Sequence, residues 1–200
     1  MERPKSVAVR KNEIRIIGGL WRSRRLAFPS SEGLRPTPDR VRETLFNWLR
    51  SEVEGSVCLD LYAGSGALGF EAASRGASQV VMVESQPDVL RALKENCSRL
   101  DARQVQVIGG CAKDYLGRDP ESFDLVFLDP PFRRGWLARS AALLEARNWL
   151  GPSALIYLEG ERGMDFSLLP SNWSTLREGV AGEVAFRLCR RQSGRHSHES

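Results

Sequence analysis

The chain has 200 residues, 42% of them hydrophobic, and a net charge of +4, which suits one globular domain with an extension. No stretch approaches 18 apolar residues and the N-terminus lacks an apolar signal core, so we expect no transmembrane helix and a cytoplasmic protein. The four cysteines form no C-x-x-C pair, which argues against disulfides and structural zinc, and no metal site is expected.

The positive charge is concentrated near the N-terminus. The first 50 residues carry 12 Lys or Arg against five Asp or Glu, whereas the other 150 carry 17 against 20. Such a concentration is the footprint of a polyanion partner, although a solvated basic tail explains the charge alone equally well.

The basic segment predicts a β-hairpin. Ile14–Ile17 reads as one strand, Gly18 and Gly19 as the turn, and Leu20–Leu26 as the returning strand. Arginines bind phosphates, and an aromatic side chain either stacks on a base or packs inward, with packing favoured for Trp21. The hairpin would display four arginines around Trp21, namely Arg15, Arg22, Arg24 and Arg25.

A helix is predicted next, with Thr37 as its N-cap, Pro38 at its first position and Asp39 complementing the dipole. Arg40 and Arg42, near its start, are expected to face solvent or a ligand. Helical spacing predicts a buried face made of Val41, Leu45, Trp48 and Leu49.

A glycine-rich turn follows the apolar run Val57–Leu61. Gly64, Gly66 and Gly69 lead into a helical pattern over 66–75, so a ligand can approach the backbone and the free N–H groups of a helix N-terminus. Glu84 ends a second strand over 79–84, 20 residues after Gly64, where an acid can accept both hydroxyls of a ribose. These features predict a nucleoside-bearing cofactor.

Two cofactors fit this turn. The Gly-x-Gly-x-x-Gly spacing matches the dinucleotide fingerprint, but it is weak alone, and Asp60 at the strand end would repel a pyrophosphate. The same carboxylate favours S-adenosylmethionine, which carries a sulfonium and an ammonium group. The remaining alternative, a turn that only joins strand and helix, leaves the acids at both strand ends unexplained.

Strands and helices alternate through the rest of the domain, which predicts a parallel sheet with helices on both faces. The predicted helices cover 87–100, 112–116 and 136–149, and the strands cover 104–108, 123–128 and 154–158. Two last strands, 173–178 and 183–189, have no helix between them and predict an antiparallel hairpin.

A second motif, Asp129-Pro-Pro-Phe132, follows the strand over 123–128. Asp129 and the carbonyl of Pro130 offer two acceptors on a stiff corner, and Phe132 offers a ring that can stack on a base. This set fits a planar exocyclic amine, whose nitrogen it would aim at a methyl donor. By itself the motif could be a plain turn, but strands 57–61 and 123–128 flank the topological switch point.

These motifs resemble the RsmD family of class I S-adenosylmethionine-dependent methyltransferases, which methylate guanine N2 in bacterial 16S ribosomal RNA. The resemblance runs from Arg15 to Cys189 and rests on segments 15–22, 34–48, 59–69 and 129–132. It implies an α/β, Rossmann-like fold with a seven-stranded, mostly parallel sheet whose last strand is antiparallel. It further implies an RNA-contacting extension over 1–33, a methyltransferase domain over 34–190 and a disordered tail over 191–200.

The resemblance assigns roles by position. The implied partner is 16S ribosomal RNA or a small-subunit assembly particle, and a monomer is the default expectation. Cys111 departs from the family, which usually has Asp or Asn there to bind adenine; Asp114 is a replacement two or three residues late. The implied cofactor residues are Asp60, Gly64 and Gly66 at the methionine end, Glu84 at the ribose and Ala112 at adenine. Those for the guanine are Asp129, Pro130 and Phe132, and those for RNA are Arg15, Arg22, Arg24, Arg25 and Arg35.

Other functions stay open at this point. An amino-methyltransferase acting on adenine N6 in DNA or on a protein glutamine would use a similar corner, usually one that starts with Asn. A non-catalytic RNA-binding assembly protein or a nicotinamide oxidoreductase would belong to another class. Asp129 and the basic hairpin favour RNA guanine, and Asp60 counts against a dinucleotide.

Overall fold

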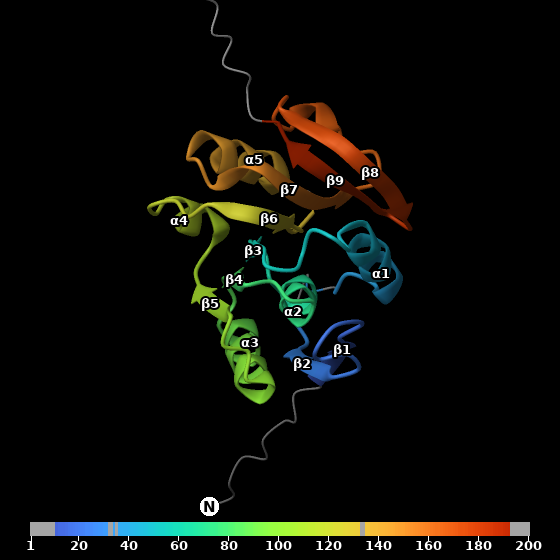
Figure 1. The fold of residues 1–200 in the computed structure, drawn as a ribbon, viewed down its shortest axis with the longest axis vertical. Coiled ribbons are helices and arrows are strands. Elements are labelled where there is room, and N and C mark those ends of the chain that lie inside the picture. The colour runs from blue at the N-terminus through green and yellow to red at the C-terminus, as the bar shows by residue number, and fades with distance from the viewer. Residues whose placement is uncertain (1–10, 32–33, 35, 133–134, 193–200) are drawn as a thin grey trace, which may run out of the picture.

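A seven-stranded sheet forms the centre of the molecule (Figure 1). The computed structural model describes residues 11–31, 34, 36–132 and 135–192. In spatial order the strands are β5 (Val105–Gly109), β4 (Gln79–Glu84), β3 (Val57–Asp60), β6 (Phe123–Leu128), β7 (Leu150–Glu161), β9 (Val184–Arg191) and β8 (Trp173–Ala181). The first five are parallel, and β9 runs antiparallel between β7 and β8. The predicted sheet is therefore confirmed.

Helices cover both faces of this sheet. One face packs against α1 (Asp39–Trp48), α2 (Ala67–Ser74) and α3 (Pro87–Leu100), and the other against α4 (Ala112–Leu116) and α5 (Trp136–Ala146). A short 3-10 helix, η1 (Phe166–Leu168), precedes β8. None of the helices in the described part of the chain is long and apolar enough to cross a membrane.

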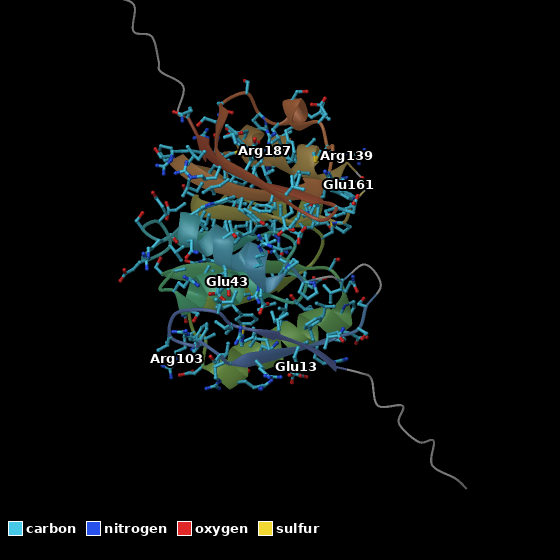
Figure 2. The ribbon with its side chains drawn as sticks, turned by 90° about the vertical axis from the view of Figure 1, so that its right-hand side faces the viewer. Glu13, Glu43, Arg103, Arg139, Glu161 and Arg187 are labelled. Atoms are coloured by element: carbon cyan, nitrogen blue, oxygen red, sulfur yellow. The ribbon has the colours of Figure 1, made fainter. Side chains whose placement is uncertain are left out.

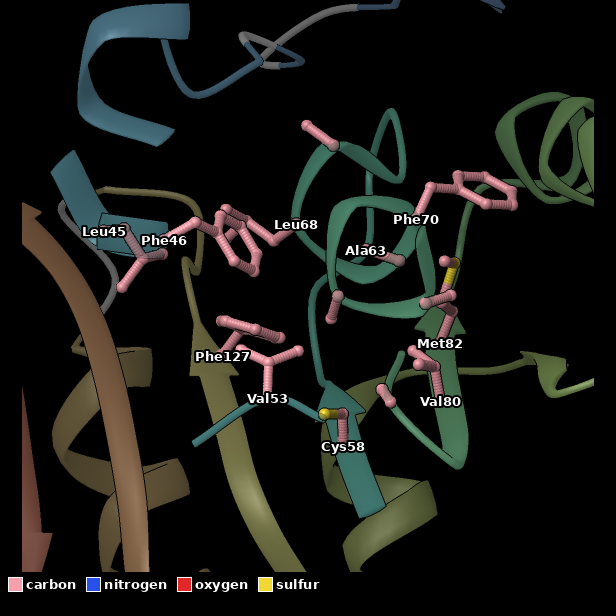
Figure 3. Close-up of a cluster of buried hydrophobic side chains, with 14 of the residues drawn as sticks. Leu45, Phe46, Val53, Cys58, Ala63, Leu68, Phe70, Val80, Met82 and Phe127 are labelled. Atoms are coloured by element: carbon pink, nitrogen blue, oxygen red, sulfur yellow. The ribbon is translucent and has the colours of Figure 1, made fainter. Parts of the chain in front are cut away.

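Alternating side chains of the central strands build two separate cores. In β6, Phe127 points to the layer of α1 and α2, whereas Leu128 points to the layer of α5. Figure 3 shows the first core, where Phe46 of α1 and Phe127 lie 6.1 Å apart between ring centroids. Both faces of these strands are buried, which explains why they read as continuous apolar runs.

The N-terminal hairpin is present, but its strands differ from the prediction. They are β1 (Lys11–Arg15) and β2 (Arg25–Pro29), and residues 16–24 form the connection. The Gly-Gly pair is therefore not a tight two-residue turn, because the connection folds against α2. Figure 2 shows that this hairpin, with Glu13, lies at the same end of the molecule as Arg103, which follows α3.

The boundaries between the extension, the domain and the tail stay a prediction. The apolar side of the hairpin, including Ile14, Leu26 and Phe28, is continuous with the core of the sheet. At the other end, β9 runs to Arg191, whose guanidinium binds the Glu145 carboxylate at 2.9 Å. The tail from 193 onwards and residues 1–10 lie outside the described residues.

Candidate active site

A cavity of about 750 Å³ opens at the carboxyl ends of β3, β4 and β6. This is the place where open α/β sheets bind ligands. It brings together seven of the eight residues predicted to bind the cofactor or the target base, namely Asp60, Gly64, Glu84, Ala112, Asp129, Pro130 and Phe132. Phe132 keeps 39% of its surface exposed, so its ring is accessible to a ligand.

Gly66, the eighth residue, does not line the cavity. It is the N-cap of α2 with φ +79°, and a Cβ there would come within 2.7 Å of Phe70 and Leu93 side-chain atoms. Gly66 therefore lies in the turn that starts α2 and packs against Phe70 and Leu93, away from the cavity.

Asp60 ends β3 and is buried, with 3% of its surface exposed. Its Oδ2 accepts a hydrogen bond from the Gly69 amide at 3.0 Å, which ties the strand end to the first turn of α2. Burial raises the pKa of Asp60 to about 7, and the negative charge of Glu84 adds to this rise, whereas the Gly69 hydrogen bond opposes it. A positive charge in the cavity would stabilise the ionised form.

Glu84 ends β4 and shapes the glycine turn. Its Oε2 accepts a hydrogen bond from the Gly64 amide at 2.9 Å, and its Oε1 accepts one from the Gln86 amide at 2.7 Å. Each carboxylate oxygen retains acceptor capacity, because an ionised carboxylate offers about four lone-pair sites. Glu84 can therefore hold the turn and still accept ligand hydroxyls.

Asp129 follows β6 and has no hydrogen-bond partner among the described residues. Its side chain is half-buried and lies in the wall of the cavity. This burial raises its pKa well above the usual range, and the nearby charges of Glu159 and Asp60 raise it further. An unpartnered acceptor in a cavity wall is suited to bind a ligand N–H.

Glu159, near the end of β7, is a further acid that the sequence pattern does not single out. The predicted strand ends at Leu158, whereas β7 continues to Glu161. Glu159 is 3% exposed, and its Oε1 accepts hydrogen bonds at 2.9 Å from both the Thr37 and the Tyr157 hydroxyls. Thr37 is therefore not the N-cap of α1, a position that Pro38 takes. The sequence signal that could have identified Glu159 is its position directly after an apolar strand, which is also the position of Asp60.

The region predicted to bind adenine is only partly explained. Ala112 begins α4 and lines the cavity, together with Cys111 and Lys113. The Cys111 Sγ accepts a hydrogen bond from the Asp114 amide at 3.4 Å and so caps α4. Asp114 is exposed and does not line the cavity, so it does not replace the missing acid.

Four of the five predicted RNA-binding arginines, Arg15, Arg22, Arg24 and Arg25, lie on the hairpin with exposed side chains. Arg15 pairs with Asp39 at 3.9 Å and Arg25 with Glu13 at 3.1 Å, while Arg24 donates to the carbonyl of Arg99. Arg35 lies outside the described residues, and Trp21 is buried, as predicted.

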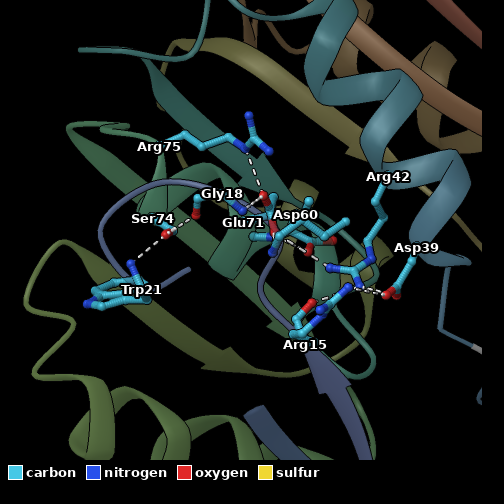
Figure 4. A network of polar contacts seen from close by, with 11 residues as sticks. Arg15, Gly18, Trp21, Asp39, Arg42, Asp60, Glu71, Ser74 and Arg75 are labelled. Atoms are coloured by element: carbon cyan, nitrogen blue, oxygen red, sulfur yellow. Dashed lines mark hydrogen bonds and ion pairs between the residues drawn. The ribbon is translucent and has the colours of Figure 1, made fainter. Parts of the chain in front are cut away.

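The connection of the hairpin is fixed to α2 by buried polar groups (Figure 4). Glu71 accepts hydrogen bonds from the Ile17 and Gly18 amides, both at 2.8 Å. Ser74 accepts one from the Trp21 amide at 2.9 Å and donates one to the Gly18 carbonyl at 2.6 Å. The hairpin is thus held by the same helix that starts at the glycine turn.

Arg42 belongs to this network, which corrects the expectation that it faces solvent or a ligand. It is 1% exposed and binds Asp39 at 2.6 Å, the Arg15 carbonyl at 2.9 Å and Glu71 at 3.6 Å. Its buried charge is therefore structural and joins α1, α2 and the hairpin.

The donor set of the cavity fits a cationic nucleoside cofactor. Three acids, Asp60, Glu84 and Asp129, line it, against the single basic group of Lys113 among the described lining residues. Burial and the neighbouring acids raise the pKa of Asp60 and Asp129, so a ligand with sulfonium and ammonium charges would stabilise their ionised forms. A pyrophosphate would destabilise these forms.

Comparisons with known proteins agree with this geometry. The sequence model of a family described as Conserved hypothetical protein 95 matches residues 14–190. Ribosomal RNA small subunit methyltransferase D of Escherichia coli (strain K12) is 48% identical over 181 residues, which are 90% of this chain and 91% of that protein. The solved structure of Escherichia coli yhhF has a TM-score of 0.83 and 46% identity, covering 92% of this chain and 100% of that chain.

A more distant structure shares the fold. The T. thermophilus 16S rRNA N2 G1207 methyltransferase, solved with AdoMet and guanosine, is 24% identical with a TM-score of 0.73 over 96% of this chain and 53% of that chain. Fold and cavity together define a class I methyltransferase. The chain belongs to the family matched over residues 14–190, which is the RsmD family.

Proposed function

We propose that this chain methylates the exocyclic N2 amine of a guanine in 16S ribosomal RNA. The coarser function, methylation of small-subunit ribosomal RNA with S-adenosylmethionine as cofactor, follows from family membership. The observation that carries the finer proposal is Asp129, an unpartnered acceptor in the wall of an acidic cavity, followed by Pro130 and the accessible ring of Phe132.

The cofactor supplies an electrophilic methyl group on a positively charged sulfur. Asp60 and the glycine turn at Gly64 would hold its methionine end, Glu84 its ribose, and the Ala112 amide its adenine, since these groups line one continuous cavity. A bound cation would lower the pKa of the neighbouring carboxyl groups and so favour the ionised form of Asp129.

The target amine is a poor nucleophile, because its lone pair is delocalised into the base. Asp129 and the Pro130 carbonyl would accept hydrogen bonds from its two N–H groups. Phe132 would stack on the ring of the base, so that the nitrogen faces the methyl donor. The ionised carboxylate stabilises positive charge that develops on the nitrogen during the transfer. No covalent intermediate with the protein is needed.

Methyl transfer from labelled cofactor to small-subunit particles and to 16S RNA, both from cells without this protein, tests the proposal. Nucleoside mass spectrometry should find 2-methylguanosine as the product. Asp129→Ala should lower its formation at least ~100-fold, while Asp119→Ala, which removes an exposed carboxylate before β6, should not change it. Methylated adenine or methylated glutamine as the product would refute the proposed substrate. Unchanged transfer by Asp129→Ala would refute the role of this residue.

Arg15, Arg22, Arg24 and Arg25 complete the proposal as the surface that binds RNA phosphates. Their side chains are exposed, and the connection that follows Arg15 is held on α2 by Glu71. The chain is proposed to act on RNA within a small-subunit particle or free in solution, and the two substrates of the assay distinguish these cases.

A further inference from the structure

Asp129 and Glu159 are neighbours at the carboxyl edge of the sheet. Strands β6 and β7 run parallel and pair Leu128 with Leu158, so the next residue of each strand emerges beside the other. Adjacent strands lie about 4.8 Å apart. The carboxyl groups of half-buried Asp129 and buried Glu159 on these neighbouring strand ends do not ionise independently, because a negative charge on one opposes ionisation of the other.

The two acids are unequal partners. The Oε1 of Glu159 accepts two hydrogen bonds, from the hydroxyls of Thr37 and Tyr157, whereas Asp129 accepts none from the described residues. Burial raises the pKa of Glu159, and the two hydrogen bonds oppose this rise, because hydrogen bonds to a carboxylate favour its ionised form. Asp129 has no such hydrogen bonds, so it is the member of the pair that holds a proton more readily.

Other groups face this pair in the described part of the chain. Asp60 approaches from β3 and raises the pKa of Asp129, and Glu84 acts on Asp60 from β4. Lys113 lies in the cavity wall at the start of α4. Among the described residues of β7 and of the segment before α1, the groups that donate hydrogen bonds to Glu159 are the neutral hydroxyls of Tyr157 and Thr37.

We propose that Glu159 is a positioning residue for methyl transfer, whose fixed negative charge makes Asp129 able to take the proton that the target amine loses. This inference deepens the proposed function and rests on it. Glu159 itself does not line the cavity, and it acts only through Asp129.

The proton balance explains why such a residue is useful. The amine nitrogen forms the new bond to the methyl carbon with its lone pair, and the electron pair of the broken bond stays with the departing donor. The nitrogen then holds one proton too many, which passes to Asp129 and from there to water. The transfer moves the positive charge from the sulfur to the amine nitrogen, and this charge leaves the cavity only together with the proton. The negative charge of Glu159 favours the protonated form of Asp129, and so helps Asp129 to accept the proton at this stage.

Glu159→Gln tests this inference with little change in shape. Both hydroxyls bind the same oxygen, Oε1, and an amide oxygen can accept both hydrogen bonds in the same way. NMR titration of ¹³C-labelled carboxyl groups should show the pKa of Asp129 falling by at least about one unit. The acidic limb of the pH profile of kcat should move by the same amount, and its plateau should fall about tenfold.

Three further variants separate this role from a purely structural one. Glu159→Asp keeps the charge and should restore most of the pH profile, while Glu178→Gln removes a surface carboxylate on β8 and should leave it unchanged. Thr37→Val removes one donor and should raise the pKa of Glu159 itself, which tests the pair even if Glu159→Gln does not fold.

An unchanged pKa of Asp129 in folded Glu159→Gln, or an unchanged Glu159 signal in Thr37→Val, would overturn the inference. A loss of thermal stability in all variants without any shift along the pH axis would also overturn it, because that is the result of a structural role. If the wild-type protein methylates no guanine, the proposed function fails, whereas the titration of Asp129 still decides the inference.

Discussion

Asp60 is expected to lower the stability of the protein but to contribute to the binding of S-adenosylmethionine. Its carboxyl group is buried beside other acids, and its Oδ2 accepts a hydrogen bond from the Gly69 amide. Asp60→Asn removes the charge and keeps an oxygen that can accept this bond. We therefore predict that the variant is more stable than the wild type at pH 8 and binds S-adenosylmethionine less tightly.

The size and sign follow from the pKa of Asp60, which is raised from 3.8 to about 7 by burial. Below pH ~4 the carboxyl group is protonated in both the folded and the unfolded chain, so its ionisation does not affect the free energy of unfolding. Between pH ~4 and ~7 only the folded chain retains the proton, and stability falls as the pH rises. Above pH ~7 the carboxyl group is ionised in both states. The pKa of Asp60 differs by about three units between the folded and the unfolded chain, which lowers the free energy of unfolding by about 4 kcal/mol at most.

Urea unfolding followed by circular dichroism at pH 4, 6 and 8 measures this effect. Asp60→Asn should raise the free energy of unfolding at pH 8 by ~1–4 kcal/mol, and the gain should vanish towards pH 4. Calorimetry should find at least ~10-fold weaker cofactor binding, because one buried charge partner is lost. A variant that is less stable at pH 8, or equally affected at every pH, would refute the reasoning.

Three further predictions concern the target base, the hairpin and the RNA surface. Phe132→Ala should raise KM for RNA about tenfold without changing cofactor affinity, because a stacked base contributes ~1–3 kcal/mol; an unchanged KM would contradict the stacking. Glu71→Gln should lower the free energy of unfolding in urea by ~3 kcal/mol, because it leaves the charge of buried Arg42 with one carboxylate fewer; a loss under ~1 kcal/mol would contradict this. Arg22→Gln combined with Arg24→Gln should weaken RNA binding and reduce its salt-dependence slope by about 0.7 for each phosphate that is no longer neutralised; fluorescence anisotropy at several salt concentrations would detect a slope that does not change.

The local sequence is sufficient to predict the bounds of helices and strands whose ends are marked by particular residues. The predicted bounds of α3, α4, β4 and β6 agree with the structure, since Pro87 starts one helix and apolar runs define the strands. The end of α5 is predicted too late, at Trp149, because Asn148 adopts φ +58° and turns the chain into β7. A left-handed asparagine has no distinct sequence pattern, so the helical spacing of apolar residues continues past Ala146, where α5 ends.

Parts of the site that depend on contacts across the chain could not be predicted. Asp60, Glu84 and Asp129 follow recognisable strands, and parallel strands bring their ends to one edge. Thr37 fits an N-cap locally, but Glu159, 122 residues away, accepts its hydrogen bond instead. The local sequence predicts that Arg42 is an exposed helix residue. The packing of α1 against α2 instead places Glu71 beside it, and no local pattern shows this contact.

The attachment of the hairpin to α2 has a geometric consequence for substrate choice. Eight helical residues, about 12 Å of rigid rod, separate the glycine turn from the end at Ser74 that holds the hairpin. A Cβ on Gly19 would lie 1.8 Å from the Ser74 carbonyl oxygen, and the Leu20 amide donates to this oxygen at 2.7 Å, so the two segments are in direct backbone contact. RNA bound by the hairpin would thus present nucleotides to the cavity at a set distance. If the proposed function holds, the target nucleotide would be selected by its distance from the bound RNA backbone, with the local base sequence secondary.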